Sequence, residues 1–143
     1  MIRRVKIQDH SEIITLLKQL WPNAPPNPEE LGGLVDQYIQ NENYDIYCYE
    51  EDKILGIITF SKRHAFFYQG KVAIIEDLVI DEPHRGKGIG KELVEYVEEE
   101  LKRQGILNIE LSSDLQRTGA HEFWEKMGYT KSGYHFRKIF NNR

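Results

Sequence analysis

The chain has 143 residues, of which 40% are hydrophobic, and a formal net charge of -4. This length suits one domain with one core, so we expect residues 1–143 to fold as a single domain. The small negative charge, without a concentrated basic face, argues against nucleic-acid binding. No apolar run approaches the roughly 20 residues that span a bilayer, which argues against a membrane protein.

The cysteine and histidine content narrows the chemistry further. Cys48 is the single cysteine, so an internal disulfide is excluded, and the polar residues after Met1 do not resemble a signal peptide. We therefore expect a cytoplasmic protein in which Cys48 is a buried, inert thiol. The five histidines fall at no metal-ligand spacing, so we predict no metal site.

The first forty residues predict a strand and two helices. Ile2–Ile7 alternates apolar and basic residues, as a strand does. Asp9 with Glu12 three residues later is the pattern of a capping box, which opens a helix. The apolar residues that we expect this helix to bury are Ile13, Leu17, Leu20 and Trp21. A proline-rich loop ends the helix, and Pro28–Gln40 predicts a second one.

The rest of the chain predicts alternating strands and helices. Tyr44–Glu50 and Ile54–Ser61 indicate a hairpin, and Val72–Ile80 a mostly buried strand. From Gly88 to about Gln104, apolar residues recur every four positions opposite a charged face, which predicts a long amphipathic helix. The last expected elements are a strand at Ile106–Leu111, a short helix at Gly119–Met127 and a closing strand or hairpin at Tyr129–Phe140. The fold class is therefore α/β with a mixed sheet, because hairpins accompany the alternation.

The segment that carries chemistry joins the strand ending at Ile80 to the long helix. It reads Asp81-Glu82-Pro83-His84 and then Arg85-Gly86-Lys87-Gly88-Ile89-Gly90-Lys91. Glycines at alternate positions let the backbone approach a ligand closely, and the unpaired N–H groups at the start of a helix bind anions. The basic side chains of this segment add charge that suits a pyrophosphate.

Two other phosphate-binding motifs fit this segment less well. A P-loop needs G-x-x-x-x-G-K-[ST], whereas the spacing from Gly86 is one residue short and Glu92 follows Lys91. The dinucleotide fingerprint G-x-G-x-x-G differs from the G-x-G-x-G found here, and no β-α-β half precedes it. An ordinary glycine-rich turn with a solvated basic face is the non-functional alternative.

The segment resembles the acyl-CoA pyrophosphate turn of the GNAT superfamily, Q/R-x-x-G-x-G/A, through Arg85, Gly88 and Gly90. A second stretch, Ala120–Tyr129, is similar to the family's A-x-x-F-Y-E-K-x-G-F segment. The resemblance covers nearly the whole chain in element order. It implies the GNAT fold, a central mixed sheet flanked by helices, and an N-acetyltransferase that uses acetyl-CoA.

The resemblance also implies how the cofactor is held. The strand ending at Ile80 and the strand ending near Ser112 are expected to splay apart, with the pantetheine arm between them. Leu78, Val79 and Ile80 would then offer backbone groups to the pantetheine and the thioester. The residues expected to hold the pyrophosphate are Arg85, Gly86, Lys87, Gly88, Ile89, Gly90 and Lys91.

Glu76 is the candidate catalytic base. By the period of a strand it should share a face with Leu78 and Ile80 and reach the acceptor amine, whereas Asp77 should face the other way. A structural carboxylate paired with Lys or Arg is the alternative for Glu76.

Trp124 stands where the family usually has a tyrosine that can protonate the leaving thiolate. An indole cannot donate a useful proton, so we expect Trp124 to pack on the pantetheine. A thiol with a pKa of about 8.5 is a fair leaving group without help, so the proton is either not needed or comes from Tyr129, Tyr134 or His121.

The acceptor is expected to be a primary amine on a small molecule or a peptide. The C-terminal part resembles bacterial aminoglycoside 6'-N-acetyltransferases, and Ile74–Asp81 resembles glucosamine-phosphate acetyltransferases, so the resemblances leave the acceptor open. Phe66, Phe67 and Tyr68 fall in a loop that we expect to form an exposed patch for a homodimer. A non-catalytic acyl-CoA-binding sensor of the same fold is the alternative function.

Overall fold

The computed structural model describes residues 1–24 and 26–140. The chain divides into two compact units, Met1–Leu111 and Ser112–Arg143, which are described separately. That residues 1–143 form one domain stays a prediction.

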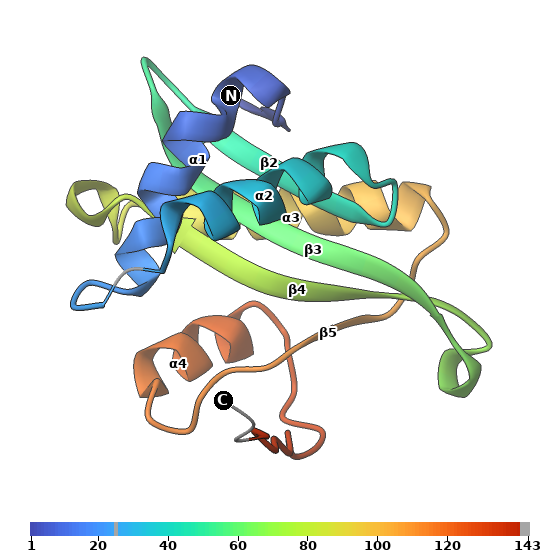
Figure 1. The fold of residues 1–143 in the computed structure, drawn as a ribbon. Helices are drawn as coiled ribbons and strands as arrows, with labels where there is room; N and C mark the ends of the chain where they lie inside the picture. The colour runs from blue at the N-terminus through green and yellow to red at the C-terminus, as the bar shows by residue number, and fades with distance from the viewer. Residues whose placement is uncertain (25, 141–143) are drawn as a thin grey trace. The chain divides into compact units, whose positions relative to one another are not determined.

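The first unit is built on a five-stranded sheet in the order β1-β2-β3-β4-β5 (Figure 1). Its strands are β1 (Ile2–Arg4), β2 (Tyr44–Glu50), β3 (Ile54–Ala65), β4 (Gly70–Ile80) and β5 (Ile109–Leu111). Neighbours from β1 to β4 are antiparallel, and β5 is parallel to β4. The mixed sheet that the sequence predicts is therefore confirmed, because hairpins join β2 to β4 while a helix connects β4 to β5.

Helices cover both faces of this sheet (Figure 1). On one face lie α1 (His10–Leu17) and α2 (Pro28–Gln40), whose apolar side chains form a buried cluster with Ile57 and Val79. On the other lies α3 (Ile89–Arg103). It buries the residues of its period-four pattern, which are Ile89, Leu93, Val97 and Leu101. Short 3-10 turns complete the unit at η1 (Ile7–Asp9), η2 (Lys18–Leu20), η3 (Phe66–Tyr68) and η4 (Glu82–His84).

The second unit contains one helix, α4 (Thr118–Lys126), within its described residues. Gly128 follows with φ of +95°, as a glycine that ends a helix does. Tyr129–Phe140 forms no strand, so the predicted closing strand or hairpin is wrong. A strand needs a hydrogen-bonded neighbour, and no described strand pairs with this segment, which leaves large side chains exposed. These exposed residues are Tyr134, Phe136, Ile139 and Phe140.

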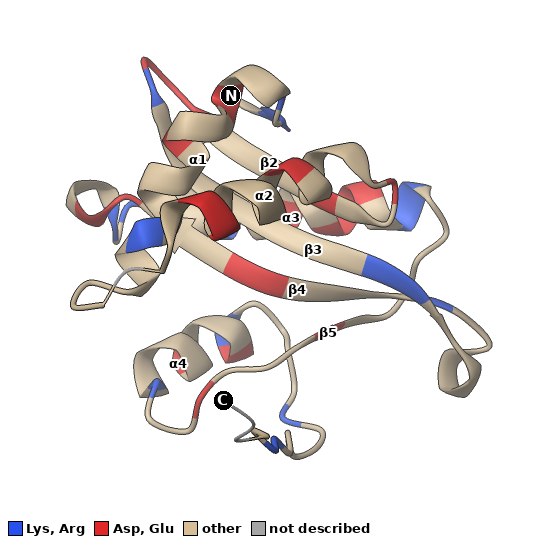
Figure 2. Cartoon of the chain, viewed as in Figure 1, with Lys and Arg blue, Asp and Glu red and all other residues tan. Residues whose placement is uncertain are grey.

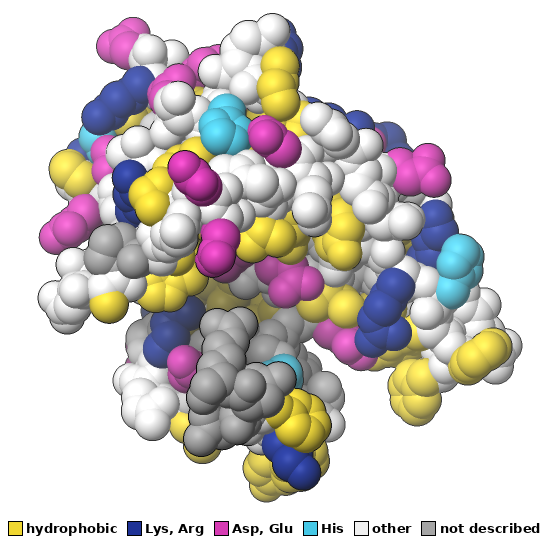
Figure 3. Space-filling view, viewed as in Figure 1, with side chains coloured by type: hydrophobic (Ala, Val, Ile, Leu, Met, Phe, Trp, Pro, Cys, Tyr) yellow, Lys and Arg dark blue, Asp and Glu magenta, His cyan; other side chains and the backbone are white. Residues whose placement is uncertain are grey.

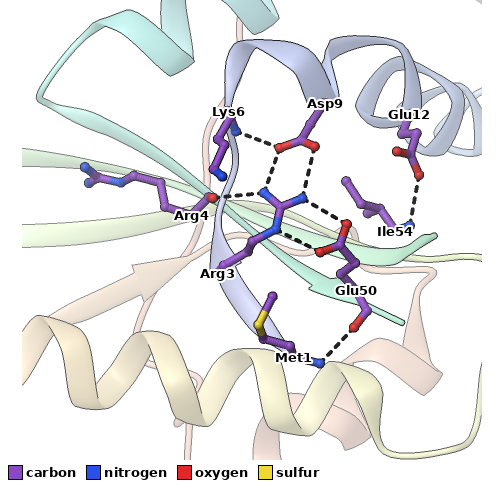
Figure 4. A network of polar contacts seen from close by, with 8 residues as sticks. All are labelled: Met1, Arg3, Arg4, Lys6, Asp9, Glu12, Glu50 and Ile54. Carbon is purple, nitrogen blue, oxygen red and sulfur yellow. Dashed lines mark hydrogen bonds and ion pairs between the residues drawn. The ribbon is translucent and has the colours of Figure 1, made fainter. Parts of the chain in front are cut away.

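The predicted capping box at Asp9 and Glu12 is wrong. The Asp9 carboxylate does not cap α1. It accepts hydrogen bonds from the Lys6 backbone N–H at 2.7 Å and from the Arg3 guanidinium at 2.8 and 3.0 Å (Figure 4). Glu12 accepts from the backbone N–H of Ile54 at 2.9 Å. Arg3 competes successfully for Asp9 because a charged donor is a stronger partner than a helix amide.

Other N-terminal expectations also need correction. The strand predicted for Ile2–Ile7 ends at Arg4. Leu20 and Trp21, which the sequence places in the core, are 37% and 40% exposed. The α-helix ends at Leu17 and continues as a 3-10 turn, which changes the angle between successive side chains and turns these two residues outward.

The ion pair between Asp9 and Arg3 predicts a contribution to stability that is lost in acid. The Arg3 guanidinium holds the pKa of the Asp9 carboxyl below its usual value, and the Asp9 side chain is 11% exposed. Because the folded pKa lies below the unfolded one, the contribution is present above about pH 4 and disappears as the pH falls through the folded pKa. Asp9→Asn should therefore lower the free energy of unfolding by about 1–3 kcal/mol at pH 7, measured in urea, and by less in acid.

The matched control is Glu99→Gln, which removes an exposed carboxylate paired with Lys102 on α3. Its effect should stay below about 1 kcal/mol at every pH. A loss for Asp9→Asn that does not change with pH would show that packing, and not charge, holds this contact.

Candidate active site

The predicted phosphate turn lies where β4 runs into α3. Ile80 ends β4, and Gly88 occupies the N-cap position of α3. Gly86 and Gly88 have φ of +76° and +87°, a backbone conformation that other residues rarely adopt. A Cβ added at either glycine would meet no atom within 4 Å, so the backbone here is open to the approach of a ligand.

Helix α3 begins without a side-chain cap. Its first turn is closed by the bond from the Glu92 N–H to the Gly88 carbonyl at 3.1 Å, so the preceding amides have no acceptor within the helix. Lys87 and Lys91 are exposed at the same turn. Together these groups offer amide and ammonium donors at the positive end of the helix dipole, which favours an anion.

Arg85 uses part of its guanidinium inside the turn. Its Nε donates to the Ile80 carbonyl at 2.8 Å, and its Nη2 donates to Oε1 of Gln19 at 3.1 Å. Contact between Arg85 and a pyrophosphate stays a prediction. Sequence reasoning did not find Gln19, because a single glutamine in a polar stretch carries no motif.

The start of α3 packs closely on β3 at Gly56. A Cβ at Gly56 would lie 2.8 Å from Ile80 Cδ1, 3.2 Å from Ile89 Cγ2 and 3.3 Å from Leu93 Cδ1. The side chains of Ile80 and Ile89 are thus used in packing, which leaves their backbone groups for any ligand contact.

The backbone of β4 is open along its last residues. Strand β4 pairs with β5 only from Ala73 to Ile75. Beyond that point, Leu78, Val79 and Ile80 pair with β3, and no other described strand pairs with them. Pairing stops at Ile75 because β5 itself ends at Leu111, which leaves one edge of this backbone without a partner among the described strands; the splay that the family resemblance implies stays a prediction.

A β-bulge in β4 reverses the direction expected for the Glu76 carboxylate. Thr59 pairs with Asp77 and Phe60 pairs with Ile75, so Glu76 is an extra residue that shifts the alternation by one. The Thr59 hydroxyl donates to Asp77 Oδ2 at 2.9 Å, and the Ser61 hydroxyl donates to Glu76 Oε1 at 3.1 Å.

Both carboxylates therefore lie on the same side of the sheet. Ile57, Thr59 and Ser61 are spaced two residues apart, so they lie on the same face of β3. Ile57 belongs to the buried cluster under α1 and α2. The prediction that Glu76 shares a face with Leu78 and Ile80 is wrong, whereas Asp77 lies, as predicted, on the face opposite those two residues.

Tyr38 of α2 lies near this pair. Burial, followed by the negative charges of Glu76 and Asp77, raises the pKa of Tyr38 to about 12. The phenol is therefore a neutral O–H donor at physiological pH. Acidic residues colour both α2 and the middle of β4 in Figure 2, and Figure 3 shows acidic side chains gathered over α2 on the same face.

Trp124 belongs to the second unit. Its ring contacts Phe123 and Tyr129 edge to face, with centroid distances of 5.0 and 5.1 Å. His121 Nε2 lies 2.7 Å from the Asp114 carbonyl, which can only accept, so this nitrogen donates its proton there. Tyr134 is 89% exposed. The source of a proton for the leaving thiolate stays open among these residues.

Cys48 is fully buried, as expected, and burial raises the pKa of its thiol to about 11. Across residues 1–24 and 26–140, no three His, Cys, Asp or Glu side chains are placed to hold a metal ion. No helix in the described part of the chain is long and apolar enough to cross a membrane.

The sequence profile of the Acetyltransferase (GNAT) family matches residues 11–129, most of the chain and the whole of the turn. The chain belongs to the GNAT acetyltransferase family. This GNAT protein is 35% identical to the uncharacterized N-acetyltransferase YhdJ of Bacillus subtilis over 131 residues, covering 85% of the chain and 92% of the relative. The resemblance drawn from Arg85, Gly88 and Gly90 is thereby confirmed.

Solved structures confirm the fold. The crystal structure of glucosamine-6-phosphate N-acetyltransferase from Arabidopsis thaliana aligns with a TM-score of 0.80 and 27% identity, covering 99% of this chain and 98% of that one. An aminoglycoside acetyltransferase from an uncultured soil metagenomic sample, in complex with sisomicin, has a TM-score of 0.80 at 20% identity, covering 99% and 96%. The mixed sheet with helices on both faces is the GNAT fold.

Proposed function

We propose that this GNAT protein transfers the acetyl group of acetyl-CoA directly to a primary amine of a small molecule or peptide. The observation that carries the proposal is the open turn at Gly86 and Gly88, where backbone amides meet Lys87 and Lys91. Such donors suit a pyrophosphate. The family match includes residues of both units, which supports residues 1–143 acting as one domain.

The positions of the predicted cofactor residues support their proposed roles. The turn Arg85–Lys91 holds the pyrophosphate, and the open backbone edge of Leu78–Ile80 pairs with the pantetheine. Acetyl-CoA, when bound, would supply a thioester; a neutral amine would attack its carbonyl carbon, the C–S bond would break and CoA would leave as a thiolate, without a covalent enzyme intermediate. Trp124 serves as a packing surface for the pantetheine, since an indole has no useful proton to donate.

Glu76 is the proposed base, which takes a proton from the acceptor ammonium. It is exposed at the bulge, where it accepts a hydrogen bond from the Ser61 hydroxyl, and among the described residues no Lys or Arg forms an ion pair with it. Asp77 is held by the buried Thr59, and the neutral phenol of Tyr38 lies near both carboxylates. Asp77 therefore adds negative charge beside Glu76 and helps to attract a cation.

The negative charge around Glu76 favours an acceptor that carries positive charge in addition to that of the reacting amine. A phosphorylated amino sugar, the kind of acceptor named for the Arabidopsis enzyme, would meet like charge here, whereas a molecule with several ammonium groups is attracted. The acidic residues of α2 and the β4 bulge are Glu29, Glu30, Asp36, Glu76 and Asp77.

Assembly and location complete the proposal. Phe66 and Phe67 are 104% and 87% exposed in η3, between β3 and β4, and a second copy of the chain is the proposed cover. The cytoplasm is the proposed location, since the lone Cys48 forms no disulfide.

Thermal unfolding with added ligands tests the cofactor assignment. CoA and acetyl-CoA should raise Tm, because a ligand that binds only the folded state stabilises it by about 2.7 kcal/mol at 100 times its Kd. ATP and NAD should raise Tm much less, since the turn lacks the spacing of the motifs that bind them. Equal stabilisation by all four ligands, or none by CoA, would contradict the assignment.

Release of free thiol from acetyl-CoA then tests turnover. The panel of amines consists of aminoglycosides, amino sugars and their phosphates, polyamines, amino acids and peptides with free N-termini. We expect release with amines that carry additional positive charge. CoA binding without thiol release for any amine would instead support the non-catalytic acyl-CoA sensor.

A further inference from the structure

Gln19, which is far from the phosphate turn in sequence, makes hydrogen bonds to the residues that lead into this turn. Gln19, half-buried in η2, contacts residues 62 to 66 positions later. Its Nε2 donates to Asp81 Oδ1 at 2.8 Å. Its Oε1 accepts from the Glu82 N–H at 3.2 Å and from Arg85 Nη2 at 3.1 Å. One side chain therefore joins the 3-10 turn before the proline-rich loop to the start of the cofactor turn.

These three partners need both a donor and an acceptor. The Asp81 carboxylate can only accept, whereas the Glu82 amide and the Arg85 guanidinium can only donate. The side-chain amide of Gln19 offers both functions, while a carboxylate or an ammonium in its place offers one. The hydrogen bond from the Gln19 amide is also the main reason why the pKa of the Asp81 carboxyl lies below its usual value.

The same contacts fix the direction of Arg85. Its Nε donates to the Ile80 carbonyl at 2.8 Å, and its Nη2 donates to Gln19 Oε1 at 3.1 Å. The guanidinium therefore points back from the turn toward the end of β4. At the other end, the Asp81 N–H donates to the Leu55 carbonyl of β3 at 2.8 Å. The backbone that leads into Gly86 is thus held at two points.

We propose that Gln19 is a positioning residue for acetyl-CoA, acting through Arg85 and Asp81 and not by contact with a substrate. The inference rests on the proposed acetyl-CoA site. Without the Gln19 amide, Arg85 and the chain before Gly86 lose hydrogen bonds that hold both in place. The backbone amides of the turn Arg85–Lys91 are then less well ordered for the pyrophosphate. Binding of acetyl-CoA weakens, while proton removal at Glu76 keeps its rate.

Steady-state kinetics of Gln19→Ala test this division. The KM for acetyl-CoA should rise about tenfold, with kcat at saturating acetyl-CoA within about twofold of wild type, and the Tm shift caused by CoA should shrink. Gln8→Ala, which changes an exposed glutamine of η1 at the other end of α1, is the control and should match wild type in all three. A folded Gln19→Ala protein with wild-type KM and Tm shift would overturn the inference.

An exchange of the two polar groups gives a second test that does not depend on a truncated side chain. Gln19→Glu alone places two carboxylates together and should raise the KM for acetyl-CoA. Adding Asp81→Asn restores one donor and one acceptor, so the double variant should recover most of the loss. No recovery in a folded double variant would overturn the inference. If wild type itself gains no stability from CoA, the proposed cofactor site fails instead.

Discussion

Glu76→Gln should keep the affinity for acetyl-CoA and lower turnover by about 10²- to 10⁴-fold, the usual contribution of a positioned base. Affinity is expected to persist because the turn and the open edge of β4 lie elsewhere on the chain. The loss should shrink at high pH, where more of the acceptor amine is already neutral. A pH–rate profile of both proteins at saturating acceptor measures this directly.

Asp77→Asn is the matched comparison, since the bulge places both carboxylates on one face and only Asp77 is held by buried Thr59. It should mainly raise the KM of a cationic acceptor and change kcat little. If Glu76→Gln also raises KM alone, Glu76 attracts the cation without removing its proton. An unchanged pH–rate profile for Glu76→Gln would remove it from the catalytic role, and lower stability with normal kinetics would make it structural.

Gly88→Asp should abolish CoA binding. The open space above this glycine is where we place the pyrophosphate, and an aspartate there adds both bulk and negative charge. The Tm shift caused by CoA should disappear, and isothermal titration should detect no binding. A folded variant with near wild-type affinity for CoA would disprove the proposed pyrophosphate site at the turn Arg85–Lys91.

Gly105→Asp controls for backbone strain. Gly105 follows α3 at the opposite end, with φ of +79° and no atom within 4 Å of an added Cβ, so the two substitutions impose similar strain. This variant should lose stability and still bind CoA. If both variants lose CoA binding, the cause is a disturbance of α3 and not a local effect at the turn Arg85–Lys91.

Much of the fold could be predicted because local pattern and burial agree. The period-four apolar residues of α3 are all buried, and the glycines of the turn adopt the positive φ values that only glycine takes easily. The predicted bounds of α2 and β2 match the structure.

What the sequence did not predict depends on partners distant in the chain. Period-two reasoning places Glu76 and Asp77 on opposite faces, and one extra residue in β4 removes that alternation. Arg85 looks like a free ligand for phosphate until Gln19 is brought beside it. The large apolar residues from Tyr134 to Phe140 suggest a strand, but they cannot report whether a neighbouring strand pairs with them.

The burial of Cys48 has a practical consequence for measuring the reaction. A disulfide reagent such as 5,5'-dithiobis(2-nitrobenzoate) reacts with thiolates, and this cysteine has no exposed surface and a pKa raised to about 11. In the folded protein the CoA released by turnover is therefore the one reactive thiol, and no cysteine needs to be replaced before the assay. Colour that develops without acetyl-CoA then reports opening of the strand that carries Cys48.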